Sequence, residues 1–236
     1  MPTISYATTA PAAAEADVLV LPVFEGPTNG PGVREVRGID LLEHYRGAGL
    51  KGKLGESLLV PNAGISGLAA KSVLLVGVGP KDEVTTDTLR RAVGRAAPQL
   101  SRHASVATTL PLAVGRTPED AVQATVEGLL LGGYRFDRYK SGANGDVPEP
   151  AALASVTVLG ASRWNSRAVR TAIERAEVIA DAQAWARDLV NTPALECTPD
   201  YLAKQAKAMA KEVGLQCTIW TEADLKKGGF GGILGV

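Results

Sequence analysis

Short apolar runs rich in Val and Leu alternate with longer amphipathic stretches in the first part of the chain. Apolar runs of this length predict buried strands, which we expect at Asp17–Phe24, Gly55–Val60, Ser72–Val78, Ala104–Leu110 and Ser155–Leu159. Apolar residues that recur every three or four positions predict helices at Ile39–Tyr45, from Thr85 or Thr86 to Pro98, and from Thr117 to the glycines at 132 and 133. Strands alternating with helices are typical of an α/β sheet covered by helices.

The predicted helix that begins near Thr117 carries several start signals. The Thr117 hydroxyl is expected to accept a hydrogen bond from a free backbone N–H of the first turn. Pro118 suits the first helical position, and Glu119 and Asp120 suit the positive end of the helix dipole. The preceding helix is expected to end at Pro98.

A longer helical pattern runs from Asn165 to Val190. It predicts one helix of about 26 residues, and hence about 39 Å, which is long enough to act as a strut between two domains. Beyond it, Thr198-Pro199 predicts the start of a helix that ends at Val213, before Gly214. The remaining predictions are a strand at Leu215–Trp220, a short helix at Glu222–Lys227 and the start of a buried element at Phe230–Val236.

These elements divide the chain into three predicted parts. An α/β domain with a mixed sheet covers residues 1–163 and includes an exposed loop at Ser141–Pro150, rich in Gly and Pro. A connecting helix covers 164–191, and an incomplete second α/β domain covers 192–236. The segment from Thr198 offers too little apolar surface for a core of its own. It therefore needs further chain, the first domain or another chain to pack against.

Composition excludes several classes of protein. The 236 residues are 45% hydrophobic, and 25 basic residues balance 25 acidic ones, so neither disorder nor broad nucleic-acid binding is expected. No apolar run reaches the length of about 18 residues needed to span a membrane. Residues 1–16 lack Lys and Arg and make a poor secretory signal. We therefore expect a cytoplasmic protein without a membrane association.

Few residues suggest chemistry by themselves. The cysteines, Cys197 and Cys217, match no zinc or redox spacing and are expected to be buried, reduced thiols. His44 and His103 belong to no metal motif and are expected at the surface or at a helix cap.

Two loops invite comparison with phosphate or nucleotide sites. Residues 77–81, Gly-Val-Gly-Pro-Lys, follow a predicted buried strand, but Pro80 removes a donor and the spacing is not GxGxxG, so a plain turn is favoured. Residues 62–64, Asn-Ala-Gly, resemble the nucleotide-binding loop of macro domains over only two or three positions.

Acidic and aromatic residues gather in two phrases of the sequence. Glu127, Asp137 and Asp188 do not form the clustered acids that a hard divalent ion requires, and we expect them to pair with Arg135, Arg138, Lys140 and Arg187. The aromatics Tyr134, Phe136 and Tyr139 could stack on nucleic-acid bases, but a packed aromatic loop at a domain or subunit contact is favoured.

The same two phrases resemble a known family. Residues 127–140, EGLLLGGYRFDRYK, and residues 187–203, RDLVNTPALECTPDYLA, are similar to segments of the leucyl or cytosol aminopeptidases, peptidase family M17. The resemblance covers roughly residues 120–236. It implies a macro-like N-terminal α/β domain, a long connecting helix and the start of a catalytic domain.

The resemblance also implies an activity for the whole protein. Members of the family release N-terminal amino acids, often leucine, from peptides, and they use two divalent metal ions such as zinc or manganese. They usually assemble as homohexamers, as dimers of trimers. The family's metal-binding phrases, of the type GKGITFDSGG and NTDAEGR, are absent from these 236 residues. No catalytic, metal-binding or substrate-binding residue can therefore be assigned here, and we expect this chain alone to be inactive.

Two alternative functions follow from the N-terminal domain alone. It could be a macro-like binding module for ADP-ribose or nucleic acid, which nucleotide binding in calorimetry would support. It could also be an assembly domain, which trimers of the chain in solution would support. The neutral net charge makes DNA binding the weaker of these readings.

Overall fold

The computed structural model describes residues 1–115, 117–139 and 153–235. The predicted loop Ser141–Pro150, together with Lys140 and Val236, lies outside the described residues. The chain forms two compact units, Met1–Ala184 and Trp185–Val236, which we describe separately. The predicted boundaries at residues 163 and 191 stay predictions.

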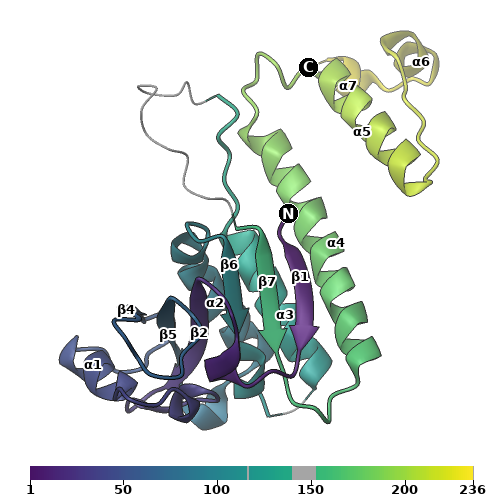
Figure 1. Ribbon diagram of the computed structural model, residues 1–236. Coiled ribbons are helices and arrows are strands. Elements are labelled where there is room, and N and C mark those ends of the chain that lie inside the picture. Colours follow the sequence, from purple (N-terminus) through teal and green to yellow (C-terminus); the bar gives the residue numbers. More distant parts are fainter. Residues whose placement is uncertain (116, 140–152, 236) are drawn as a thin grey trace. The chain divides into compact units, whose positions relative to one another are not determined.

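A mixed seven-stranded sheet forms the centre of the first unit as far as it is described (Figure 1). The strand order is β1-β7-β6-β2-β5-β4, with β3 paired to β2 off this path. Neighbours along the path are parallel except β4, which is antiparallel to β5. The strands are β1 Thr3–Ala7, β2 Val18–Phe24, β3 Thr28–Asn29, β4 Ser57–Pro61, β5 Ser72–Gly79, β6 Ser105–Thr108 and β7 Ser155–Leu159.

The continuous apolar runs of the sequence form strands whose side chains are buried on both faces of the sheet. Every residue of β2 and β5 is buried. Because side chains alternate along a strand, Val18 and Val20 belong to one core and Leu19 and Leu21 to the core on the opposite face. This is why these strands read as unbroken hydrophobic runs.

Helices cover the two faces of the sheet. The helices are α1 Leu41–Gly47, α2 Thr86–Leu100, α3 Pro118–Gly132, α4 Ser166–Asn191, α5 Pro199–Val213, α6 Glu222–Lys227 and α7 Gly231–Leu234. α2 and α3 contribute to the core that contains Val18, and α1 contributes to the core that contains Leu19. Apolar residues of α3, β7 and the first half of α4 form a third cluster around Val158. Figure 1 shows α4 alongside β1 at that edge of the sheet.

One carboxylate ties together the starts of three parallel strands in the middle of the sheet. Asp17 accepts hydrogen bonds at Oδ2 from the backbone N–H groups of Ala104 (2.9 Å) and Ser105 (3.0 Å). Its Oδ1 lies 2.6 Å from Lys71 Nζ. The Lys71 ammonium and these backbone donors lower the pKa of Asp17 below its usual value. Asp17 thereby connects the starts of β2, β5 and β6.

The second unit is helical in the part that the structure describes. Thr198 Oγ1 accepts from Tyr201 N (3.3 Å) at the start of α5, and Gly214 adopts a left-handed conformation at its end, as the sequence predicted. Thr221 and Asp224 form a capping box at the start of α6. These local signals were sufficient to predict α5 and α6.

Two strand predictions need correction. β1 was not predicted, because its five residues pair only with β7, a distant part of the sequence. Leu215–Trp220 was predicted as a strand, but the structure assigns none there. A strand requires a hydrogen-bonded partner, and none is present among the described residues of the second unit.

Three smaller predictions also differ from the structure. Thr117 adopts φ 50° and makes no side-chain cap, because the cap geometry requires an extended residue. α2 continues past Pro98 to Leu100, because a proline this near the end removes only one helical hydrogen bond. Phe230–Val236 was predicted to start a buried element, yet within its described residues Phe230 is 41% and Ile233 62% exposed. The predicted fold class, a mixed sheet flanked by helices, is confirmed.

Candidate functional site

Glu127 lies where α3 faces α2, and its carboxylate is fully engaged. Its side chain is 7% exposed, its Oε2 lies 2.6 Å from Arg90 Nε, and its Oε1 accepts from Gln123 Nε2 at 2.7 Å. The predicted pairing of Glu127 with the arginines of its own phrase is therefore wrong, because α2 brings Arg90 closer. A carboxylate held in this way joins two helices and is poorly placed to act as a base or metal ligand.

The glycines of the same phrase allow the two helices to approach closely. A Cβ at Gly128 would lie 3.0 Å from Val93 Cβ and would collide with Arg90 O. A Cβ at Gly132 would lie 2.7 Å from Gly94 Cα. The phrase Glu127–Gly132 is thus explained by packing between α2 and α3.

The aromatic residues after α3 pack on one another. The ring centroids of Phe136 and Tyr139 are 5.7 Å apart, and the Arg138 guanidinium lies 5.9 Å from the Tyr139 ring centroid. Asp137 pairs with Arg135 Nη2 at 2.8 Å, which confirms that predicted ion pair. The contact between Phe136 and Tyr139 agrees with the predicted packed aromatic loop. That this loop lies at a domain or subunit contact stays a prediction.

The second phrase marks the end of α4. The carbonyl oxygen of Asp188 accepts from Thr192 N at 2.9 Å and from Thr192 Oγ1 at 2.6 Å. The predicted ion pair between the Asp188 carboxylate and Arg187 stays a prediction. Cys197 Sγ lies 3.5 Å from Leu189 O. The phrase therefore turns the chain from α4 toward α5.

The macro-like loop has no free recognition group at Asn62. Asn62 Nδ2 donates to Leu68 O (3.0 Å) and Ala70 O (2.8 Å), and its Oδ1 accepts from Ile65 N (2.8 Å). Its amide thus shapes its own loop. Gly77 lies within β5, and a Cβ there would collide with Lys53 O and lie 3.0 Å from Tyr45 Oη, so that glycine serves close packing. Neither loop presents a built phosphate site.

The histidines and cysteines are not assembled into a reactive group. His44 is exposed on α1, with Nδ1 3.0 Å from Asp40 O, as expected of a surface histidine. His103 is half-buried. The prediction that both cysteines are buried is wrong, since Cys217 is exposed and Cys197 is half-buried.

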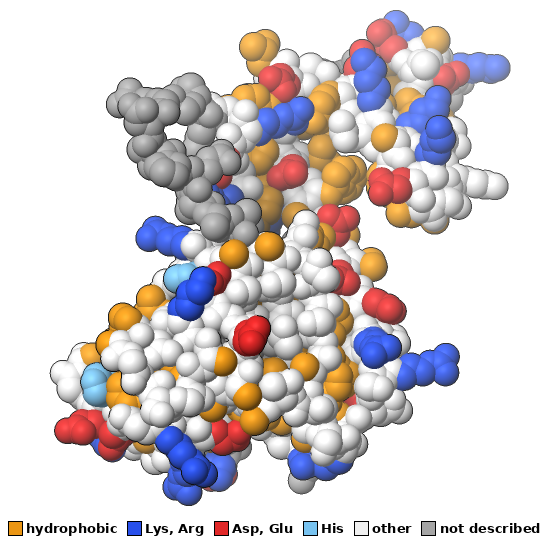
Figure 2. Space-filling view, viewed as in Figure 1, with side chains coloured by type: hydrophobic (Ala, Val, Ile, Leu, Met, Phe, Trp, Pro, Cys, Tyr) orange, Lys and Arg blue, Asp and Glu red, His pale blue; other side chains and the backbone are white. Residues whose placement is uncertain are grey.

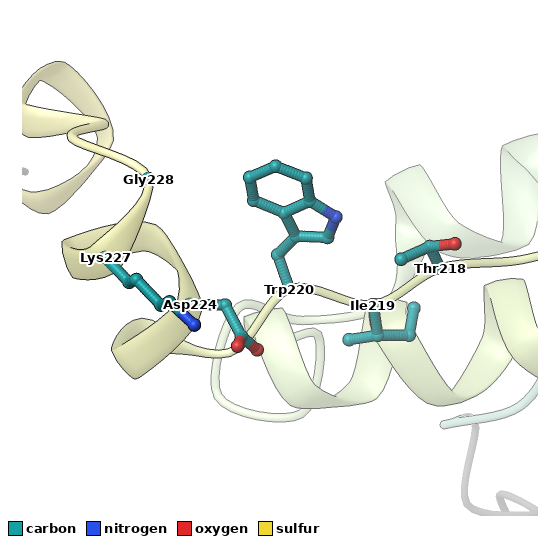
Figure 3. Close-up of a pocket in the computed structure, with 6 residues that line it drawn as sticks. All are labelled: Thr218, Ile219, Trp220, Asp224, Lys227 and Gly228. Atoms are coloured by element: carbon teal, nitrogen blue, oxygen red, sulfur yellow. The ribbon is translucent and has the colours of Figure 1, made fainter.

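The second unit contains a shallow hollow that sequence reasoning missed (Figure 3). It has a volume of about 490 Å³ and is lined by Thr218, Ile219, Trp220, Asp224, Lys227 and Gly228. Trp220 packs edge-on against Phe230, with ring centroids 5.0 Å apart. The sequence shows only a Trp in an uncharged segment at this place, which does not by itself indicate a hollow.

The acidic group of this hollow already has a structural role. Asp224 Oδ2 accepts from Thr221 N (2.9 Å) and Thr221 Oγ1 (2.7 Å). The Thr221 hydroxyl and backbone N–H lower the pKa of Asp224 below its usual value. With one committed carboxylate and one amine, from Lys227, the hollow offers a binding surface without a paired acid and base.

Potential metal ligands are dispersed over the described part of the chain. Among residues 1–115, 117–139 and 153–235, no three or more His, Cys, Asp or Glu side chains gather where they could hold a metal ion. A two-metal site requires several converging ligands, so the donors present here do not fit one.

Among residues 1–115, 117–139 and 153–235, no helix is long and apolar enough to cross a membrane. Lys, Arg, Asp and Glu are interspersed on the face of the first unit that Figure 2 shows, in keeping with zero net charge.

Solved structures share this fold. The bottromycin maturation enzyme BotP aligns with a TM-score of 0.69 and 28% identity, over 90% of this chain and 41% of that one. A tomato leucine aminopeptidase variant aligns with a TM-score of 0.72 over 90% of this chain and 42% of that one; at 22% identity it supports the fold alone.

Three curated relatives are each named "Probable cytosol aminopeptidase". A protein from Streptomyces griseus is 37% identical over 100% of this chain and 48% of its own length. One from Mycobacterium bovis is 38% identical over 100% of this chain and 46% of its own. One from Mycobacterium sp. strain KMS is 40% identical over 73% of this chain and 32% of its own. The chain thus spans less than half the length of these relatives.

Two family descriptions match successive parts of the chain. The N-terminal domain of the cytosol aminopeptidase family matches residues 20–143, and the catalytic domain of the same family matches residues 184–236. The two matches lie in the order that the resemblance implied and cover most of the chain. The chain belongs to the cytosol aminopeptidase family.

Proposed function

We propose that these 236 residues are the N-terminal portion of a metal-dependent leucyl aminopeptidase that releases N-terminal amino acids from peptides. The observation that carries the proposal is the match of both family domains, in order, to one chain. The relatives named cytosol aminopeptidase and the shared fold support it.

In this proposal the residues described here support the reaction without performing it. Glu127 is occupied by Arg90 and Gln123, and Asp224 is occupied by Thr221. The described residues supply no converging metal donors. The two divalent ions, zinc or manganese, would be held by residues outside this set, and we derive no catalytic step from the residues present.

The proposal also covers the substrates, the location and the assembly of the whole protein. The whole protein would act on peptide substrates in the cytoplasm and would assemble as a homohexamer, without nucleic acid or a membrane. The balanced charge of the chain supports the expectation about nucleic acid.

Hydrolysis of leucine p-nitroanilide tests the proposal. With Mn²⁺ or Zn²⁺ added, we expect the full-length protein to release nitroaniline and the purified 236-residue chain to release none above the blank. The full-length Streptomyces griseus relative, assayed in parallel, controls for the metal and the substrate. Saturable, chelator-sensitive turnover by the 236-residue chain would overturn the non-catalytic role, and an inactive full-length protein beside an active relative would overturn the proposed activity.

A further inference from the structure

A hollow in the first unit lies between the start of α3 and the turn that precedes α4. Its volume is about 390 Å³, and we name it the Trp164 hollow. Leu112, Val114 and Trp164 form its apolar part, and each of these side chains is half-buried. A space of this size with a partly apolar lining is typical of sites that bind small molecules.

The walls of the Trp164 hollow are held in place by contacts of their own. The Trp164 ring stacks on Tyr6, with ring centroids 6.3 Å apart and an interplanar angle of 13°. The Trp164 backbone N–H donates to Ala161 O at 2.9 Å. On the other side of the hollow, Val114 packs against the core that contains Val18. Walls that are ordered before binding lower the entropic cost of holding a ligand.

Two ionisable side chains of opposite sign line the same hollow. Glu119, in the first turn of α3, is half-buried, and Arg163, in the turn before α4, is exposed. Within the part of the chain that the structure describes, neither side chain makes a hydrogen bond or an ion pair. Glu119 thereby differs from Glu127, whose carboxylate is occupied by Arg90 and Gln123. Since a partly buried carboxylate without a partner is costly, Glu119 favours a ligand that brings a positive group.

A free α-amino acid with an apolar side chain complements this lining. Its ammonium matches the Glu119 carboxylate, and its carboxylate matches the planar guanidinium of Arg163, which can donate two parallel hydrogen bonds. Its side chain matches the apolar part of the hollow. A simple anion such as phosphate would be repelled by Glu119, and a simple cation would be repelled by Arg163.

We propose that the Trp164 hollow binds a free α-amino acid with an apolar side chain, whose ammonium is held by Glu119 and whose carboxylate is held by Arg163. The inference rests on the lining of the hollow. It does not depend on the proposed aminopeptidase activity, so either can fail while the other stands.

Isothermal titration calorimetry of L-leucine into the 236-residue chain tests the site. We expect one leucine to bind per chain with a Kd below about 1 mM. Glu119→Gln and Arg163→Gln should each weaken binding by about tenfold or more, because each removes a charge-assisted contact. Glu174→Gln and Arg170→Gln are the matched controls, because both residues are exposed on α4 and neither lines the hollow. The two control variants should bind leucine like the original chain.

Analogues of leucine that lack one charged group test the orientation of the ligand. 3-Methylbutylamine lacks the carboxylate and 4-methylpentanoate lacks the ammonium, so each should bind the original chain about tenfold or more weakly than leucine. In Arg163→Gln, leucine and 3-methylbutylamine should bind equally, because the partner of the carboxylate is gone. In Glu119→Gln, leucine and 4-methylpentanoate should bind equally for the corresponding reason. A general loss of structure would not produce this match between ligand group and residue.

Glycine tests the apolar part of the hollow. It keeps both charged groups but has no side chain to bury, so it should bind about tenfold or more weakly than leucine. Equal binding of glycine and leucine would overturn the preference for an apolar side chain.

Three outcomes would overturn the site itself. The first is the absence of saturable heat at millimolar leucine. The second is binding that is unchanged in both Glu119→Gln and Arg163→Gln, which would place leucine elsewhere on the chain. The third is binding that Glu174→Gln or Arg170→Gln weakens as much, which would mean that the overall charge of the surface, and not the hollow, attracts the ligand.

Discussion

The two units of the chain bury their apolar residues to very different extents. In the first unit, β2 and β5 are completely buried and helices close both faces of the sheet. In the second unit, large apolar residues remain exposed, among them Val190, Leu195, Val213, Leu215, Trp220 and Ile233. Yet each unit contains helices that begin with well-formed caps, at Thr85 in the first and at Thr198 and Thr221 in the second. Local capping therefore forms helices without a core, whereas burial requires partners from distant parts of the chain.

The sharpest test of this contrast replaces one apolar side chain in each unit. Leu74 is fully buried in β5, so Leu74→Ala should lower the free energy of unfolding by about 2–5 kcal/mol. Ile219 is 42% exposed, so Ile219→Ala should change it by less than about 0.5 kcal/mol. Urea unfolding followed by circular dichroism measures both. Equal losses in the two variants would mean that the second unit has a core of its own.

A glycine substitution in each unit sharpens the comparison. Gly132→Ala would place a Cβ against the Gly94 backbone and 2.9 Å from Ala97 Cβ, so α2 and α3 must separate. We expect a loss of about 3 kcal/mol in the free energy of unfolding. Gly232→Ala is the control, since Gly232 lies in α7 with no atom within 4 Å of the added carbon. A Gly132→Ala chain with unchanged urea unfolding would disprove close packing as the reason for the glycine.

A smaller effect is expected on the pH dependence of the free energy of unfolding, through Asp17 in the first unit. The folded state lowers the pKa of Asp17, so its contribution is fully present above the unfolded pKa of about 3.9 and is lost as the pH falls through the folded value. We expect Asp17→Asn to lower the free energy of unfolding at neutral pH by about 1.5 kcal/mol, because its charge-assisted hydrogen bonds are lost. The difference between the two chains should shrink below about pH 4. A constant difference down to pH 2 would show that the carboxylate charge is not the cause.

What the sequence predicted correctly depends on nearby residues. The long helix α4, the Thr198 cap and the left-handed Gly214 followed from patterns within a few positions. The missed strand β1 and the ion pair of Glu127 with Arg90 depend on residues far away in the chain. Thr117 carried a cap signature but took a left-handed conformation, and Leu215–Trp220 carried a strand signature without a partner. At the candidate site, the hollow around Trp220 depends on how α6 and the turn after it fold. The spacing of residues in the sequence does not indicate this arrangement.

The pairing of β1 with β7 has a consequence for how the protein is made. Thr3 lies opposite Ser155, so β1, which is synthesised before β7, cannot pair until β7 has been made. Until then β1 has no strand to pair with, and the N-terminal residues remain accessible to chaperones and proteases. Closing so long a loop also makes this edge a late step in folding. A bulky fusion at Met1 would therefore interfere most with the completion of the sheet, long after its central strands have formed.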